Sequence, residues 1–268
     1  MVLRRDRSVV LASLLVLALL SWSYLFWFSG NMALLHADGG MAVAGMAPDF
    51  QDWSALHFLT MFLMWAVMMV GMMTPSVAPM ILLYAQVARS APRERKVFAP
   101  AAWFVAGYLL AWSLFALIAT TGQWALEGLA LLNPNLASKS GIFGGLLLIA
   151  AGIYQWTPFK QACLAQCRSP LLFIQQNGGF QARGPASLGL GLLHGTFCIG
   201  CCWALMALLF VGGVMNFAWV ALLMVLVLLE KIVPRGVVLA RGAGLLMILA
   251  GGAMLAMRQL PFHWPAPG

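Results

Sequence analysis

Seven long apolar stretches follow one another along this chain, and they decide what it can fold into. A helix needs roughly 20 apolar residues to cross the hydrocarbon core of a bilayer. An α-helix also satisfies its own backbone hydrogen bonds there. The sequence therefore predicts an all-α polytopic transmembrane bundle of about seven helices in a single membrane domain, residues 1–268. The stretches are 8–28, 54–88, 98–121, 140–157, 185–211, 215–232 and 236–257.

The low content of charged residues supports the same fold class. Hydrophobic residues make up 63% of the chain and charged residues 8%, whereas ordinary soluble domains carry about 25% charged residues. The net charge of +8 would suit a nucleic-acid partner. However, the basic residues lie in short clusters between the apolar stretches, which is a topology signal and not a phosphate-binding face. We therefore expect membrane lipids and not nucleic acid as the surroundings.

The distribution of Lys and Arg predicts the orientation. Of the fifteen such residues, only Lys139 and Arg258 fall in segments on the side opposite to the N-terminus. Basic loops stay in the cytoplasm. We expect a bacterial inner-membrane protein with a cytoplasmic N-terminus, an uncleaved first helix and an external C-terminus. This topology puts an external loop at 29–53 and a cytoplasmic loop at 158–184.

Two segments share a weak sequence repeat. Both 141–152 and 241–252 contain Gly-Leu-Leu-x-Ile followed by Ala and Gly. One interpretation is that the helices of 54–157 and of 185–268 form two inverted three-helix repeats, which in transporters place a site near the midplane. The other is that both segments use glycine for close helix packing.

The stretch 54–88 carries methionines at helical spacing. With a histidine they form a stripe along one helix face, and thioethers are soft, uncharged ligands that suit Cu(I). The alternative is that methionine fills packing gaps. Pro75 and Pro79 predict a kink or break near Thr74–Pro75. The stripe consists of His57, Met61, Met64, Met68 and Met72, flanked by Met69 and Met73.

The stretch 185–211 combines thiols with an imidazole. His194, Cys198 and Cys201 share one helical face, and Cys202 lies at its edge. Thiolate and imidazole ligands favour Cu(I), Zn²⁺ or an iron–sulfur centre, although a single buried cysteine is usually an inert apolar residue. Small residues at 191 and 195 predict the close approach of another helix.

The two loops carry further soft residues. Cys163 and Cys167 have helical spacing in the cytoplasmic loop and are either a thiol port or an ordinary reduced pair. The external loop, a capture arm or a flexible segment, contains Met32, His36, Met41 and Met46.

Glu230 and Lys231 are expected to pair or to reach the interface at the end of 215–232, and a proton-coupling role for Glu230 has no other support in the sequence.

Three ordered motifs resemble a bacterial family. They are Met64-Trp65 through Met72-Met73-Thr74-Pro75, then Cys163-Leu-x-x-Cys167-Arg-Ser-Pro, and Cys198-x-Gly-Cys201-Cys202-Trp203 running on to Glu230-Lys231. The chain resembles uncharacterised proteins described as predicted metal-binding integral membrane proteins. The resemblance implies the membrane architecture more than an activity.

The leading hypothesis is a protein that binds, and transports, a soft metal ion along these residues. Cu(I) is the first candidate and Zn²⁺ the second, with a metal chaperone or a membrane complex as a possible partner. No phosphate-binding loop occurs, so no nucleotide is expected, and we do not expect an enzyme. Two alternatives remain: a transmembrane thiol–disulfide carrier, in which Cys198 and Cys201 cycle, and an accessory subunit of a larger complex.

Overall fold

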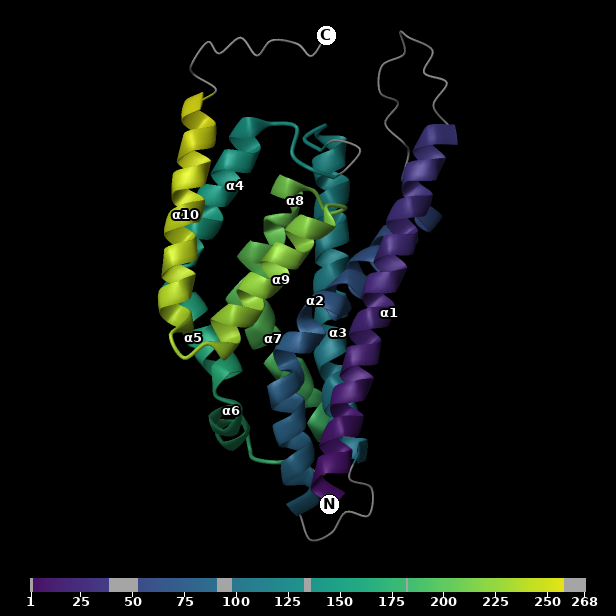
Figure 1. Ribbon diagram of the computed structural model, residues 1–268, viewed down its shortest axis with the longest axis vertical. Coiled ribbons are helices and arrows are strands. Elements are labelled where there is room, and N and C mark those ends of the chain that lie inside the picture. Colours follow the sequence, from purple (N-terminus) through teal and green to yellow (C-terminus); the bar gives the residue numbers. More distant parts are fainter. Residues whose placement is uncertain (1, 39–52, 91–97, 133–135, 182, 258–268) are drawn as a thin grey trace. The chain divides into compact units, whose positions relative to one another are not determined.

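The computed structural model describes residues 2–38, 53–90, 98–132, 136–181 and 183–257 (Figure 1). Within these ranges the chain is helical and no strand forms; one isolated antiparallel bridge joins Leu132 and Ser138. The all-α prediction is therefore confirmed. The helices are α1 (Val2–Asp38), α2 (Ala55–Ser90), α3 (Phe98–Gly128), α4 (Gly141–Tyr154), α5 (Pro158–Arg168), α6 (Pro170–Gln176), α7 (Gly184–Ala207), α8 (Leu209–Gly212), α9 (Phe217–Ile232) and α10 (Gly236–Met257).

Each of the seven predicted stretches is helical, but fewer than seven pass a test of length and apolarity. In the described residues, five segments are long and apolar enough to cross a membrane. A sixth exists if α4 and α5, which meet at an angle of 65°, form one broken span. Helix α9 has only 16 residues. The five segments are Leu11–Phe28, Ala55–Val87, Pro100–Gly128, Gly184–Gly212 and Gly236–Met257.

Both predicted loops contain more helix than expected. Helix α1 continues to Asp38, so Met32 and His36 belong to a helix, while Met41 and Met46 lie outside the described residues. The segment 158–184 contains α5 and α6. Each of these begins with a proline, whose fixed φ suits the first helical position and whose missing N–H is not needed there. The helical spacing predicted for Cys163 and Cys167 is that of α5.

Helix α2 continues through both of its prolines. The expected break near Thr74–Pro75 does not occur, although the ribbon of α2 changes direction along its length (Figure 1). Two hydroxyls near this point bond to other carbonyls than those that the prolines leave without a donor: Thr74 Oγ1 donates to the Val70 carbonyl at 2.6 Å and Ser76 Oγ to the Met73 carbonyl at 2.9 Å.

The chain divides into two compact units, and the division falls inside α7. The first unit comprises Met1–Gly128 and Ser169–Ile199, and the second comprises Leu129–Arg168 and Gly200–Gly268. The first therefore holds α1, α2, α3, α6 and most of α7. The second holds α4, α5, α8, α9 and α10 together with the last turns of α7.

In the first unit, α3 and α7 approach backbone to backbone. A Cβ at Gly107 would collide with the Leu188 carbonyl, and one at Gly191 would collide with the Phe104 carbonyl. A Cβ at Gly195 would meet the Ala111 side chain. The close approach predicted for Gly191 and Gly195 is therefore confirmed, and it holds the functional face of α7 against α3.

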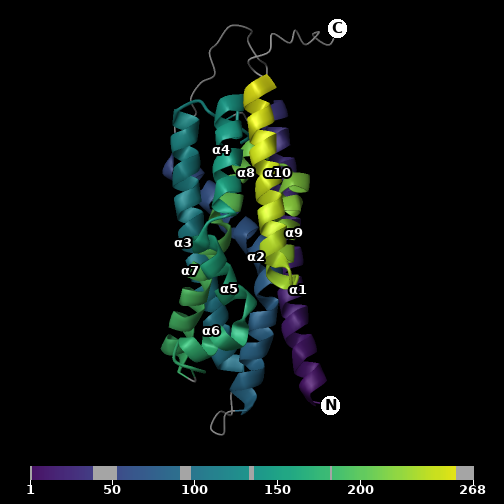
Figure 2. The same cartoon turned by 90° about the vertical axis from the view of Figure 1, so that its left-hand side faces the viewer.

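In the second unit, α4 and α10 pack through glycines (Figure 2). A Cβ at Gly152 would lie 2.6 Å from the Gly244 carbonyl oxygen, and one at Gly251 would lie 2.5 Å from the Gly145 carbonyl oxygen. The two segments that share the sequence repeat thus face one another, and close packing explains their shared glycines. The inverted repeat stays a prediction.

Candidate functional site

The methionine stripe of α2 lies in the interior of the first unit. Met61 is 3% exposed, and the other stripe methionines are exposed by 1% or less. His57, at the N-terminal end of the stripe, is half-buried, and its ring meets the Trp53 ring edge-on with centroids 4.8 Å apart. Burial of this kind fits a packing role and a ligand role equally.

A chain of polar groups that the sequence analysis missed joins α2 to α3. The Trp65 indole donates to Gln123 Oε1 at 2.7 Å, and Gln123 Nε2 donates to Glu127 Oε1 at 2.8 Å. The Trp53 indole donates to Glu127 Oε2 at 2.9 Å. The predicted helix 98–121 ended before these residues. The sequence signal that could have found this chain of polar groups is the spacing of Gln123 and Glu127, two polar residues four positions apart in a helix that is otherwise apolar.

His194 and Cys198 lie in an aromatic enclosure in the first unit. The His194 ring is 4.8 Å from Phe173, 5.8 Å from Phe104 and 6.0 Å from Tyr108 between centroids, and the residue is 3% exposed. The Tyr108 hydroxyl lies 3.2 Å from Cys198 Sγ and donates to the Met73 carbonyl at 3.5 Å. One phenol thus connects the methionine stripe with the first cysteine of α7.

In the second unit, α5 brings Cys163 against α7. A Cβ added to Gly200 would lie 2.8 Å from Cys163 Sγ, so the glycine leaves room for this sulfur beside Cys201. Cys163 is 6% exposed, and Cys201 and Cys202 are each 1% exposed. Because Gly200 precedes Cys201 directly, α5 places Cys163 at the turn of α7 that carries Cys201. The sequence had assigned these thiols to separate places, a loop and a helix.

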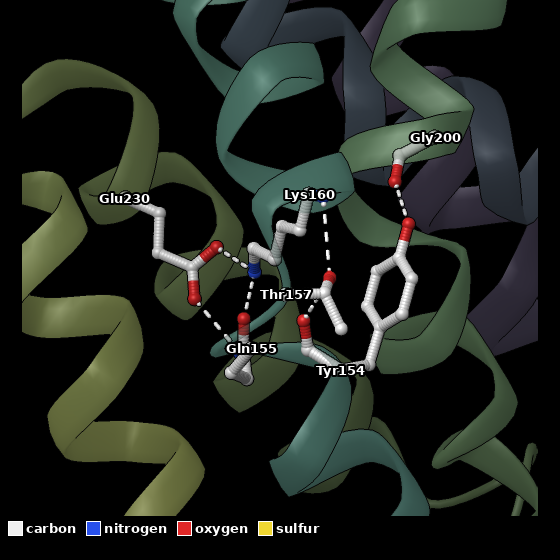
Figure 3. A network of polar contacts seen from close by, with 6 residues as sticks. All are labelled: Tyr154, Gln155, Thr157, Lys160, Gly200 and Glu230. Atoms are coloured by element: carbon white, nitrogen blue, oxygen red, sulfur yellow. Dashed lines mark hydrogen bonds and ion pairs between the residues drawn. The ribbon is translucent and has the colours of Figure 1, made fainter.

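Tyr154 completes this cluster. Its hydroxyl donates to the Gly200 carbonyl (Figure 3), and its ring meets Trp203 at 5.2 Å between centroids. The phenol is within electrostatic range of Cys163, Cys201 and Cys202. We name Tyr154, Cys163, Cys201 and Cys202 the thiol cluster. Cys167 is half-buried one turn beyond Cys163 on α5.

A buried ion pair joins α9 to α5, the helix that also carries Cys163. Lys160 Nζ is 2.7 Å from Glu230 Oε2, and the two side chains are 1% and 2% exposed. Gln155 donates to Glu230 Oε1 at 3.0 Å and accepts a hydrogen bond from Lys160 (Figure 3). The expectation that Glu230 would pair with its neighbour Lys231 or reach the interface is wrong, because α5 folds back and offers Lys160.

Among the described residues, no three His, Cys, Asp or Glu side chains converge closely enough to hold a metal ion. None of the five cysteines, all of which are described, forms a disulfide. The proposed ligands instead fall into two sets. His57, the methionines, His194 and Cys198 belong to the first unit, and Cys163, Cys167, Cys201 and Cys202 belong to the second.

The described residues form long apolar helices with methionines, cysteines and the Lys160–Glu230 pair in their interior, which are the features of a polytopic helical membrane protein. The chain belongs to the PpoB2 family, described as copper chaperone, whose model matches residues 62–254. The match includes the thiol cluster, the Lys160–Glu230 pair and most of the methionine stripe, and it begins after His57 and Met61. No curated protein and no solved structure matches the chain.

Proposed function

We propose that this protein binds Cu(I) inside the membrane and passes it along a path of thioethers and thiolates. The observation that supports the proposal is the position of Cys163, whose sulfur would lie 2.8 Å from a Cβ at Gly200, the residue that precedes Cys201 in α7. Two cysteines separated by 38 positions are brought to one place, in a family described as copper chaperone.

The chemistry of the thiol cluster suits this ion. Cu(I) prefers soft sulfur ligands and accepts two thiolates as a complete donor set. We assign Cys163 and Cys201 as that pair, with Cys202 as an alternative partner on α7. Their burial keeps water and competing hard ligands away, and the Tyr154 hydroxyl, bonded to the Gly200 carbonyl, holds the loop end of α4 against the cluster.

The first unit supplies a second set of soft donors. Met61, Met64, Met68, Met72 and Met73 offer neutral thioethers, which bind Cu(I) weakly enough to release it and avoid the penalty of a charge in hydrocarbon. Tyr108 marks the point where this stripe meets Cys198, and Cys201 follows Cys198 by about one turn of α7.

The proposal makes the protein a binding and transfer protein, not an enzyme. The basic loops orient the N-terminus and Cys167 toward the cytoplasm of a bacterial cell. A soluble metal donor or acceptor protein is then the expected partner. Zn²⁺ is the competing ion for the same sulfur ligands.

A competition titration tests this function. The protein is purified in detergent without oxygen and titrated with Cu(I) against a chromophoric Cu(I) chelator, beside the variants Cys163→Ser and Cys201→Ser. We expect each variant to lose at least tenfold in affinity. Cys167→Ser, which changes a thiol on the same helix one turn away, is the matched control and should stay within about threefold. Equal affinity in all four proteins would refute the site.

The same pair of sulfurs supports a second candidate function. Cys163 contacts the turn of α7 that carries Cys201, and a thiol–disulfide carrier would cycle these two thiols between the reduced and the disulfide form. Trapping cells with an alkylating reagent separates the two functions. A Cys163–Cys201 disulfide that forms and disappears with the redox state of the cell favours the carrier, and thiols that stay reduced favour copper.

A further inference from the structure

We propose that the turn between α9 and α10 binds the phosphate headgroup of an anionic phospholipid. The site consists of three guanidinium groups, those of Arg168, Arg235 and Arg241, which we name the arginine cluster. All three residues belong to the second unit. The inference concerns the surface of this unit and not its thiols, so it goes beyond the proposed function and does not depend on copper.

Arg168, the last residue of α5, is bound to the turn between α9 and α10. Its Nη2 donates to the carbonyls of Val233 and Pro234, which directly precede Arg235. Its Nη1 would lie 3.2 Å from a Cβ at Gly236, the residue where α10 begins. The guanidinium of Arg168 is therefore held on the same short turn that carries Arg235.

Both of these arginines keep donors for a ligand. A guanidinium has five N–H groups, and the contacts of Arg168 with the turn use only those of Nη2. Arg235 is exposed, and its guanidinium makes no hydrogen bond or ion pair with the described residues. The turn thus presents several guanidinium N–H groups to its surroundings.

Arg241 is held against α5 from the side of α10. Its Nη2 donates to Gln161 at 3.4 Å, and its guanidinium carbon lies 5.8 Å from the centre of the Trp156 ring. Gln161 and Arg168 are seven positions apart on α5, which places them on one face and about 10 Å apart along the helix. The three arginines therefore gather along one face of α5.

The arginine cluster has no acidic side chain of its own unit to neutralise it. Glu230 is the only acidic residue that the sequence places in the second unit, and Lys160 pairs with it at 2.7 Å. Cations without such partners attract an anion from outside the protein. The planar guanidinium of arginine binds phosphate oxygens in a bidentate manner, so a phosphate group is the anion that these side chains fit best.

The position of the cluster along the span matches the headgroup layer of a bilayer. The apolar segment Gly236–Met257 has 22 residues, which extend over about 33 Å as a helix and so cover the hydrocarbon core. The turn before Gly236 then lies at the boundary of that core. Trp156, which is 50% exposed beside Arg241, is of the residue type that is enriched at this boundary.

Apolar side chains near the turn favour a lipid over a soluble phosphate compound. Ile232 and Val238 precede and follow Arg235 by three positions, and they are 57% and 66% exposed. The acyl chains of a phospholipid would cover this apolar surface while its phosphate contacts the arginines. An anionic headgroup is preferred to a zwitterionic one, because the zwitterionic headgroup brings a cation of its own to a site that already holds three.

Lipid binding measured by native mass spectrometry tests the inference. The purified protein in a non-ionic detergent is mixed with dioleoyl phosphatidylglycerol or with dioleoyl phosphatidylcholine, which has the same chains and no net charge. We expect the wild type to bind its first phosphatidylglycerol about tenfold more tightly than its first phosphatidylcholine. Arg235→Gln removes an exposed guanidinium without a structural contact, so it should reduce this preference to about threefold or less.

The matched control is Lys139→Gln, which removes one exposed cation of the same unit at the opposite end of α4 and should keep the full preference. Equal affinities of the wild type for the two lipids would overturn the inference. A preference that survives Arg235→Gln, or one that Lys139→Gln also removes, would overturn it too. Displacement of the lipid by an equal concentration of glycerol 3-phosphate would do the same, because the ligand would then be a soluble phosphate ester.

A fluorescence measurement locates the bound lipid. Bromine atoms on an acyl chain quench a tryptophan that they contact, and the contribution of Trp156 among the eleven tryptophans is the difference between the wild type and Trp156→Phe. We expect brominated phosphatidylglycerol to quench this contribution at a lower lipid fraction than brominated phosphatidylcholine does, and Arg235→Gln to abolish the difference. Equal quenching of Trp156 by the two lipids in the wild type would overturn the inference.

Discussion

Removing Lys160 alone should destabilise the protein far more than removing Lys160 and Glu230 together. The variant Lys160→Met leaves the Glu230 carboxylate buried, with Gln155 as its remaining donor. Breaking a buried ion pair from one side costs about 3 to 5 kcal/mol, because the other charge stays without compensation. We therefore expect Lys160→Met to lower the free energy of unfolding by about 3 kcal/mol.

The double variant Lys160→Met/Glu230→Gln removes both charges and keeps similar volumes and the polar contact to Gln155. Replacing both members of a buried pair is often close to neutral, so we expect the double variant within about 1 kcal/mol of the wild type. The assay is reversible unfolding in mixed micelles with increasing SDS, followed by tryptophan fluorescence. Equal losses in the single and double variants would refute the reasoning, since the cost would then come from lost packing and not from an unbalanced charge.

Two further predictions concern packing and the methionine stripe. Gly152→Leu places a side chain where a Cβ alone would lie 2.6 Å from the Gly244 carbonyl oxygen. We expect this overpacking to lower the free energy of unfolding by more than about 2 kcal/mol, measured in the same assay. The control Gly252→Ala, with open space around its Cβ position, should change the free energy of unfolding by less than about 1 kcal/mol. The triple variant Met64→Leu/Met68→Leu/Met72→Leu conserves volume, so we expect a total loss of no more than a few kcal/mol. If the thioethers carry Cu(I), copper transfer into liposomes containing this variant should fall at least tenfold; unchanged transfer would mean that the methionines serve packing alone.

The sequence predicted those features that depend on neighbours along one helix. Apolar length was enough to find the seven long helical stretches, and helical spacing was enough to find the glycines of α7 that contact α3. These inferences need only the 3.6-residue period and general rules of close packing.

The features that the sequence did not predict depend on chain segments far apart. Lys160 was read as an ordinary cytoplasmic charge, and Glu230 was matched with the residue beside it. Their pairing requires α5 to fold back at an angle of 65° to α4, and no local pattern encodes that bend. The contact of Cys163 with Gly200 has the same origin. Local periodicity contains no information about which helices meet.

The separation of Lys160 and Glu230 along the chain also sets an order for biogenesis. Glu230 is synthesised 70 residues after Lys160, which takes about 4 to 14 seconds at the usual rates of translation. During that interval an unpaired lysine in hydrocarbon is unfavourable by about 3 kcal/mol. We therefore expect α5 to stay at the membrane surface until α9 has entered the bilayer. On this reasoning the thiol cluster, whose Cys163 lies on α5, is among the last parts of the molecule to assemble.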